Sequence, residues 1–166
     1  MAIIVEDGSG IAGANSYVSV TEARAYAAAR GTPLPVDNAA VEVLLIRAMD
    51  FVESYRGEFQ GSKTDAGQPL QWPRIGVNLD GSELDGSVIP DVLTAAQIQL
   101  AIYAEGEDLM PTDTGRSVVM EKVDVVQVQY AITRSTNMQP IFTKAEVLLR
   151  PLLRRGLGGA LRTLRV

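Results

Sequence analysis

The chain has 166 residues, of which 46% are hydrophobic, and its formal net charge is −5. It contains no histidine and no cysteine, which excludes a serine–histidine–aspartate triad, thiolate catalysis, disulfides and cysteine-ligated zinc. No side chain has an ordinary pKa near neutrality, so the usual acid–base group of enzymes is missing. We therefore expect one folded domain that is not an enzyme and that holds no cofactor and no metal.

The charges are unevenly distributed along the chain. Residues 1–139 carry nine basic and nineteen acidic side chains, a balance of −10, whereas residues 140–166 carry six basic and one acidic, a balance of +5. A basic end on an acidic body suggests that the end has a partner of its own. No apolar run approaches the roughly 20 residues that cross a bilayer, and Met1–Asp7 lacks the features of a secretory signal. We expect a protein made in the cytoplasm, without a membrane partner.

The first third of the chain predicts a short strand at residues 3–5 and two helices. Ser19-Val20-Thr21-Glu22 has the form of a capping box, in which Ser19 and Glu22 each bond the backbone of the other. It predicts a helix over about residues 23–30. A second helix, over about residues 38–55, is predicted by apolar residues that recur at three- and four-residue spacing. These residues are Val41, Leu44, Leu45, Ala48, Met49, Val52 and Tyr55.

The middle of the chain changes character three times. Residues 57–91 predict a long ordered loop, because Gly, Pro, Asp and Ser are frequent and no period holds. A helix is expected over about residues 90–105, opened by proline. Between about residues 116 and 132, side chains alternate with a two-residue period, which predicts a β-hairpin. Two strands alone are marginally stable, so the hairpin needs a surface, either the protein's own helices or a neighbouring subunit.

The C-terminal segment combines leucines with arginines. Thr143-Lys144-Ala145-Glu146 has the form of a second capping box, and Pro151 weakens any helix beyond it. In a continued helix, seven apolar residues would share one face, and Arg154, Arg155, Arg162 and Arg165 would occupy the opposite one. A disordered basic end is one interpretation. We favour a segment that orders when its leucines enter a groove on a partner, because a solvated tail needs no apolar face.

These patterns together predict a mainly α fold. We expect a small helical bundle with a long ordered loop, one β-hairpin and an extended C-terminal arm. The body would comprise residues 1–142, including the hairpin, and residues 143–166 would form the C-terminal helix and arm.

Three features resemble known sites, but the residues around them favour ordinary roles. The glycines of Gly8–Gly13 have the G-x-G-x-x-G spacing of a dinucleotide-binding loop, yet no helix is expected to begin there. The three carboxylates of Asp80–Asp85 could hold calcium, but they lack the spacing of an EF-hand. Trp72 could stack on a DNA base, although its acidic surroundings favour packing into the core. We therefore expect two turns and a buried tryptophan.

A series of short motifs points to a family. The motifs are Glu6-Asp7-Gly8-Ser9-Gly10, Ala14-Asn15-Ser16-Tyr17-Val18-Ser19, Ala29-Arg30-Gly31, Leu45-Ile46-Arg47-Ala48-Met49-Asp50-Phe51, Tyr55-Arg56-Gly57, Trp72-Pro73-Arg74 and Ile89-Pro90. Over roughly residues 5–135 this series resembles a family of small phage and prophage proteins that are encoded among head and neck genes. The family is labelled as DnaT-like single-stranded DNA-binding proteins. Here the usual glycine of the hairpin turn is replaced around Asp124.

The resemblance implies a head–tail connector (adaptor) subunit of a tailed-phage virion. Such subunits form a ring, of about twelve copies by portal symmetry, that joins the portal protein to the downstream neck or tail-terminator protein. Phage DNA would pass through the ring without specific binding. On this hypothesis the portal contacts are Leu152, Leu153, Arg154, Arg155, Leu157, Leu161, Arg162, Leu164 and Arg165. The subunit interface would include Val126, Val128, Tyr130, Trp72 and Arg74. The protein would be made in the host bacterial cytoplasm and would reside at the head–tail junction.

Two alternatives from other classes remain. The first is a single-stranded DNA-binding protein of replication type, as the family's label says. The acidic body argues against it, because DNA binding by counterion release needs clustered lysine and arginine. The second is a hydrolase that uses only carboxylates and a metal ion. A DNA affinity that falls steeply with salt would distinguish the first alternative from the connector.

Overall fold

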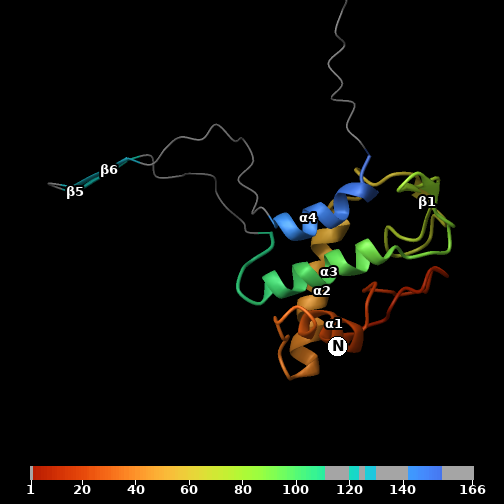
Figure 1. Cartoon of the computed structure of the whole chain (residues 1–166), viewed down its shortest axis with the longest axis horizontal. Coiled ribbons are helices and arrows are strands. Elements are labelled where there is room, and N and C mark those ends of the chain that lie inside the picture. Colours follow the sequence, from red (N-terminus) through yellow and green to blue (C-terminus); the bar gives the residue numbers. More distant parts are fainter. Residues whose placement is uncertain (1, 111–119, 124–125, 130–141, 155–166) are drawn as a thin grey trace, which may run out of the picture. The chain divides into compact units, whose positions relative to one another are not determined.

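The structure, a computed structural model, describes residues 2–110, 120–123, 126–129 and 142–154 (Figure 1). The chain divides into two compact units, one formed by Met1–Leu109 with Phe142–Val166 and the other by Met110–Ile141. The described helical elements are α1 (Val20–Ala28), α2 (Asn38–Ser54), α3 (Asp91–Ala104), α4 (Thr143–Leu149) and the 3₁₀ turn η1 (Arg150–Leu152). All of them belong to the first unit. The described fold is mainly helical with a hairpin, which confirms the predicted fold class.

Helix α3 is the centre of the first unit, because α1, α2 and α4 all pack against it. Figure 1 shows α2 crossing behind α3, with α4 alongside. Eight of the fourteen residues of α3 are buried. The buried face of α2 consists of Val41, Leu44, Leu45, Ala48, Met49, Phe51 and Val52. This confirms the apolar stripe predicted for α2. Burying one valine, leucine, methionine or phenylalanine side chain contributes about 1.5–3 kcal/mol to folding.

One of the two predicted capping boxes is present. Ser19 Oγ accepts a hydrogen bond from Glu22 N at 3.2 Å, and Glu22 Oε2 accepts one from Ser19 N at 2.9 Å. The box predicted at Thr143 is wrong. Helix α4 is preceded by Phe142, which makes no side-chain cap, and Thr143 is already helical. Phe142 is the N-cap instead, because its carbonyl oxygen accepts the first helical hydrogen bond, from Glu146 N at 2.9 Å, and its ring packs 5.4 Å from Phe51 between centroids.

A buried amide joins three segments of the first unit. Gln97 of α3 is fully buried. Its Oε1 accepts from Tyr17 N at 3.0 Å, and its Nε2 donates to Ser16 Oγ at 2.9 Å and to Leu45 O at 3.0 Å. Buried polar groups cost free energy unless they are hydrogen-bonded. Gln97 therefore fixes the N-terminal segment against α2 and α3.

The long loop expected over residues 57–91 contains two small antiparallel sheets. Strand β1 (Ser62–Lys63) pairs with β2 (Arg74–Ile75), and β3 (Asn78–Leu79) pairs with β4 (Ser82–Glu83). The β3–β4 turn is Asp80-Gly81, with φ of 52° and 87°. These positive angles suit a two-residue hairpin turn, for which Asp-Gly is a preferred sequence. The strand predicted at residues 3–5 is only a single bridge, between Val5 and Ser16.

The second unit contains the predicted hairpin. Strand β5 (Met120–Val123) is antiparallel to β6 (Val126–Gln129), with Met120 opposite Gln129 and Val123 opposite Val126. The turn around Asp124 and residue Tyr130 lie outside the described residues. Among the helices that the structure describes, none is both long and apolar enough to span a membrane.

Candidate functional site

The described C-terminal residues are fastened to the loop that follows α2. Leu153 forms an antiparallel bridge with Phe59. On one side of the bridge Gln60 N donates to Leu152 O at 2.9 Å, and on the other Arg154 N donates to Glu58 O at 2.6 Å. The Arg154 guanidinium also donates from Nε to Phe59 O at 3.0 Å. These bonds fix the point from which the chain continues beyond residue 154.

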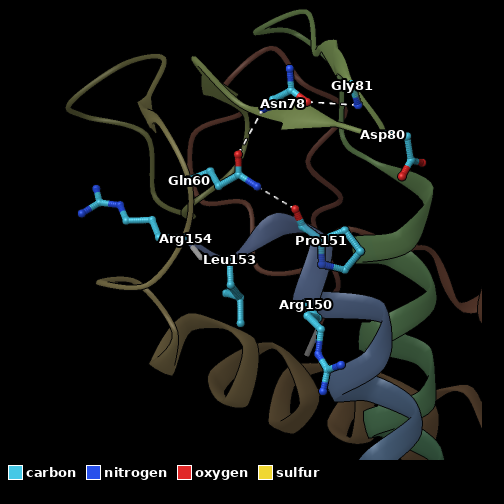
Figure 2. A pocket seen from close by; sticks show the side chains of 8 residues that line it. All are labelled: Gln60, Asn78, Asp80, Gly81, Arg150, Pro151, Leu153 and Arg154. Carbon is cyan, nitrogen blue, oxygen red and sulfur yellow. Dashed lines mark hydrogen bonds between the residues drawn. The ribbon is translucent and has the colours of Figure 1, made fainter. Parts of the chain in front are cut away.

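A groove of about 910 Å³ lies beside this attachment. Its lining residues, shown in Figure 2, are Gln60, Asn78, Asp80, Gly81, Arg150, Pro151, Leu153 and Arg154. Gln60 joins the two walls, because its Nε2 donates to Pro151 O at 2.7 Å and its Oε1 accepts from Asn78 N at 3.2 Å. We call this feature the Arg150–Arg154 groove. It is built by the β3–β4 hairpin on one side and by η1 with the two residues that follow it on the other.

The groove carries two cations and one carboxylate. Arg150 and Arg154 are both exposed, and Asp80 is the acidic residue among the lining side chains. In Figure 2 the two guanidinium groups extend in different directions on either side of Leu153. They therefore do not clamp one small anion. Separated arginines of this kind can instead contact successive charges of an extended polyanion.

Arg74 supports the groove from inside the protein. Its side chain is buried and donates to Gln60 O at 2.6 Å, to Gly61 O at 2.9 Å and to Gln71 O and Oε1 at 3.2 Å. No carboxylate pairs with it among the described residues. Burial, and next the positive charge of Arg154, lowers the pKa of Arg74. Arg74 thus holds the Gln60 segment by charge-assisted hydrogen bonds from its guanidinium to uncharged oxygen acceptors.

Several residues expected at interfaces lie in the interior. Trp72 is fully buried, and its ring packs edge-on against Phe59 at 5.9 Å between centroids. Trp72 and Arg74 therefore offer no exposed surface to a neighbouring subunit or to a DNA base. Leu152, expected at a portal contact, is also fully buried. The burial of Trp72 confirms the core packing that its acidic surroundings favoured. Leu152 was expected outside because the sequence does not show that residues 58–60 cover the chain at residues 152–154.

Of the other residues predicted to contact the portal or a neighbouring subunit, the structure describes only some. Leu153 is half-buried and Arg154 is exposed in the groove. The others in the C-terminal arm, Arg155, Leu157, Leu161, Arg162, Leu164 and Arg165, lie outside the described residues. Val126 and Val128 lie on β6, but the structure does not describe their side chains.

The glycine loop near the N-terminus is already occupied by a carboxylate of the protein itself. Glu6 is buried, its Oε1 accepts from Gly8 N at 2.9 Å and Gly10 N at 2.8 Å, and its Oε2 accepts from Ile11 N at 2.8 Å. Gly8 has a φ of 103°, and a Cβ there would lie 1.7 Å from Ser87 O. The loop therefore uses its glycines to surround an internal anion, as phosphate loops do with an external one.

The acidic stretch at Asp80–Asp85 has a local role. Asp85 accepts from Ser87 N at 2.8 Å and from Ser87 Oγ at 2.6 Å, and these bonds lower the pKa of Asp85. Within the described residues, no group of three acidic side chains is arranged to hold a metal ion.

Arg150, Gln60 and Asn78 line the groove but were not singled out from the sequence. Arg150 could have been found, because it belongs to the same basic C-terminal segment as Arg154. Gln60 carries no such signal, since its role depends on a contact with Pro151, which is 91 residues away along the chain.

A family model described as "Putative DnaT-like ssDNA binding protein" matches residues 1–166, the whole chain. No curated protein and no solved structure gives a significant match. The match agrees with the motifs that run from Glu6 to Pro90. Its description agrees with the DNA-binding alternative rather than with the connector, for which these comparisons give no support. The chain belongs to this family.

Proposed function

We propose that this protein binds single-stranded DNA through its phosphates, without catalysing a reaction on it. The observation that carries the proposal is the pair of exposed arginines, Arg150 and Arg154, in an open groove. The groove lies at the start of the chain's basic end, where residues 140–166 have a balance of +5. The family's description supports the same class of ligand.

The mechanism rests on phosphate contacts rather than on base stacking by tryptophan. The only tryptophan, Trp72, is fully buried and cannot reach a base. Each phosphate neutralised on a single strand lowers the logarithm of the binding constant by about 0.7 per tenfold rise in salt. Arg150 and Arg154 alone would give a slope of about −1.4. If Arg155, Arg162 and Arg165 also contact the strand, the slope would approach about −3.5.

Fluorescence anisotropy with a labelled oligo(dT) strand, measured at several salt concentrations, tests the proposal. We expect the double variant Arg150→Gln/Arg154→Gln to bind more weakly, with a slope smaller in magnitude by about 1.4. Arg56→Gln is the matched control, because Arg56 is exposed but does not line the groove. Circular dichroism of each variant verifies that the fold is kept. Absence of DNA binding by the wild type at low salt would refute the proposal.

A second candidate function is the head–tail connector subunit. It is favoured by the acidic balance of residues 1–139 and by the bonds that fix residues 152–154, since a docking arm needs a fixed starting point. On this proposal residues 156–166 dock on the portal protein, and copies of the chain form a ring that also contacts the downstream neck or tail-terminator protein. The acidic body would then repel passing phage DNA, and the protein would reside in the virion.

Electron microscopy of the purified protein mixed with its portal protein separates the two candidates. A ring on the portal that is lost when residues 156–166 are deleted, together with no DNA affinity at moderate salt, would support the connector. Salt-sensitive DNA binding without a portal complex would support the DNA-binding protein.

A further inference from the structure

A second pocket lies at the opposite end of α4 from the Arg150–Arg154 groove. It has a volume of about 280 Å³ and is lined by Arg30, Thr32, Gln99, Ile102, Tyr103 and Lys144. These residues come from the turn after α1, from α3 and from the first turn of α4. None of the lining side chains is acidic. We call it the Tyr103 pocket.

Contacts on three sides hold the walls of the Tyr103 pocket in place. The Tyr103 ring is half-buried and lies 5.2 Å from the buried Phe142 ring between centroids. Gln99 Nε2 donates to Tyr26 Oη at 3.4 Å. The Arg30 guanidinium lies 3.3 Å from the centre of the Tyr26 ring and donates to Tyr26 O at 3.2 Å. The pocket is therefore an ordered surface with an aromatic wall.

Two cations at the rim have no carboxylate partner among the described residues. Arg30 and Lys144 are both exposed, and the ion pair that the structure describes is the one between Arg47 and Asp108. Aromatic rings beside unpaired cations are what proteins use to bind single-stranded nucleic acid, with a base on the ring and phosphates on the cations. Trp72 was expected to pack in the core rather than to stack on a base, and it is buried, whereas Tyr103 has a ring beside Arg30 and Lys144.

We infer that the Tyr103 pocket holds one base of the DNA strand whose phosphates contact Arg150 and Arg154. The inference rests on the proposed function. A volume of 280 Å³ is small for a drug-sized ligand and suits a smaller flat group. Tyr103 and Ile102 supply the apolar wall, the Gln99 side chain borders the base, and Arg30 and Lys144 lie where the flanking phosphates would be.

A continuous stripe of exposed residues connects the two sites. Lys144, Val147 and Arg150 are all exposed and follow one another at three-residue spacing along α4 into η1. Residues three apart are neighbours on a helix surface, and each such step turns by about 60°, so the stripe crosses α4 obliquely and Lys144 and Arg150 lie about 120° apart around the axis. The rise from Lys144 to Arg150 is roughly 9 Å, which corresponds to about two or three phosphate intervals of a stacked strand. A strand leaving the pocket can thus cross α4 and reach the groove.

Photocrosslinking tests this path directly. Oligonucleotides that carry 5-iodouracil at one position are irradiated with the wild-type protein, and the attached peptide is identified by mass spectrometry. We expect attachment at Tyr103, the aromatic residue that lines the pocket. In anisotropy titrations, Tyr103→Leu should weaken binding by roughly 5- to 10-fold, whereas Tyr103→Phe should keep wild-type affinity because the ring remains.

Charge at the rim provides an independent readout. Lys144→Glu should weaken binding and reduce the magnitude of the salt slope by at least about 0.7. Arg56→Glu is the matched control, since it makes the same change of charge at an exposed residue outside both pockets. Urea unfolding followed by Trp72 fluorescence confirms that each variant is folded.

The outcomes separate this inference from the function on which it rests. If the wild type does not bind DNA at any salt concentration, both fail. If the wild type binds and the groove variants weaken it, but Tyr103→Leu and Lys144→Glu bind as the wild type does and the crosslinks map elsewhere, the inference alone is wrong. If Lys144→Glu and Arg56→Glu weaken binding equally, the pocket has no specific role.

Discussion

Replacing Glu6 with glutamine should destabilise the first unit although it changes only one atom of the side chain. The Glu6 carboxylate accepts three backbone hydrogen bonds at 2.8–2.9 Å, from Gly8, Gly10 and Ile11. A glutamine can present its carbonyl oxygen to Gly8 and Gly10, but its amide group would then face Ile11 N–H. The side-chain N–H of glutamine and the backbone N–H of Ile11 are both donors, so the hydrogen bond that Glu6 Oε2 now accepts from Ile11 N would be lost.

The size of the effect follows from these three bonds. A hydrogen bond to a charged acceptor contributes about 1.5–3 kcal/mol and a neutral one about 1 kcal/mol. Weakening the two retained bonds therefore costs about 1–4 kcal/mol in all, and the orphaned Ile11 N–H adds about 1–3 kcal/mol. Water can reach the half-buried Ile11 and offset part of this loss. We expect a decrease in the free energy of unfolding of about 3 kcal/mol, or roughly 6–12 °C in Tm.

Urea denaturation followed by the fluorescence of Trp72 measures this change, because the only tryptophan is fully buried in the same unit. Asp7→Asn is the matched control. It makes the same change of charge one residue away, but Asp7 is exposed and should have little influence on stability. If Glu6→Gln unfolds at the same urea concentration as Asp7→Asn, the carboxylate does not hold the loop. The argument about its three bonds would then be wrong.

Two further predictions concern buried polar groups. Gln97→Leu should lower the free energy of unfolding by about 2–4 kcal/mol in urea titrations, because Tyr17 N loses its acceptor in the interior; an unchanged midpoint would contradict this. Burial, and next the charge of Glu53, raises the pKa of Tyr17 well above the ordinary value of 10.0. The neutral phenol is therefore favoured in the folded state, so this stability is intact below about pH 10 and is lost as the pH rises further. Thermal melts between pH 8 and 11 should show the loss in the wild type and less of it in Tyr17→Phe.

The helices were predictable because their signals are local. The apolar stripe of α2 and the Ser19–Glu22 box depend on residues within a few positions of one another, and both are present. The box at Thr143 failed because Phe142 is the N-cap instead, with its ring packed against Phe51, which is distant in sequence. The β3–β4 hairpin had a local signal too, the turn sequence Asp80-Gly81. It was not predicted because residues 57–91 as a whole show no alternation of apolar and polar side chains.

The candidate site was much less predictable than the helices. Arg154 could be predicted as a contact residue because it lies in a basic segment. Its neighbours in the groove include residues 60, 78, 80 and 81, which are distant in sequence and gave no such signal. The core packing expected for Trp72 is confirmed, but the sequence alone cannot show that another segment covers Leu152 in the leucine–arginine segment. The Tyr103 pocket is a similar case, since it combines residues from positions 30, 99–103 and 144.

The net charge of the chain is a weak guide to whether it binds DNA. At physiological salt, charges separated by more than about 8 Å are largely screened. Acidic side chains far from Arg150 and Arg154 therefore oppose a bound strand only slightly, and Asp80 is the carboxylate that lines the groove. Two arginines nevertheless release few counterions, so tight binding needs either the arginines beyond residue 154 or several copies of the chain on one strand. The number of chains bound per strand, measured beside the salt slope, thus distinguishes a single protein with a basic arm from subunits that act side by side.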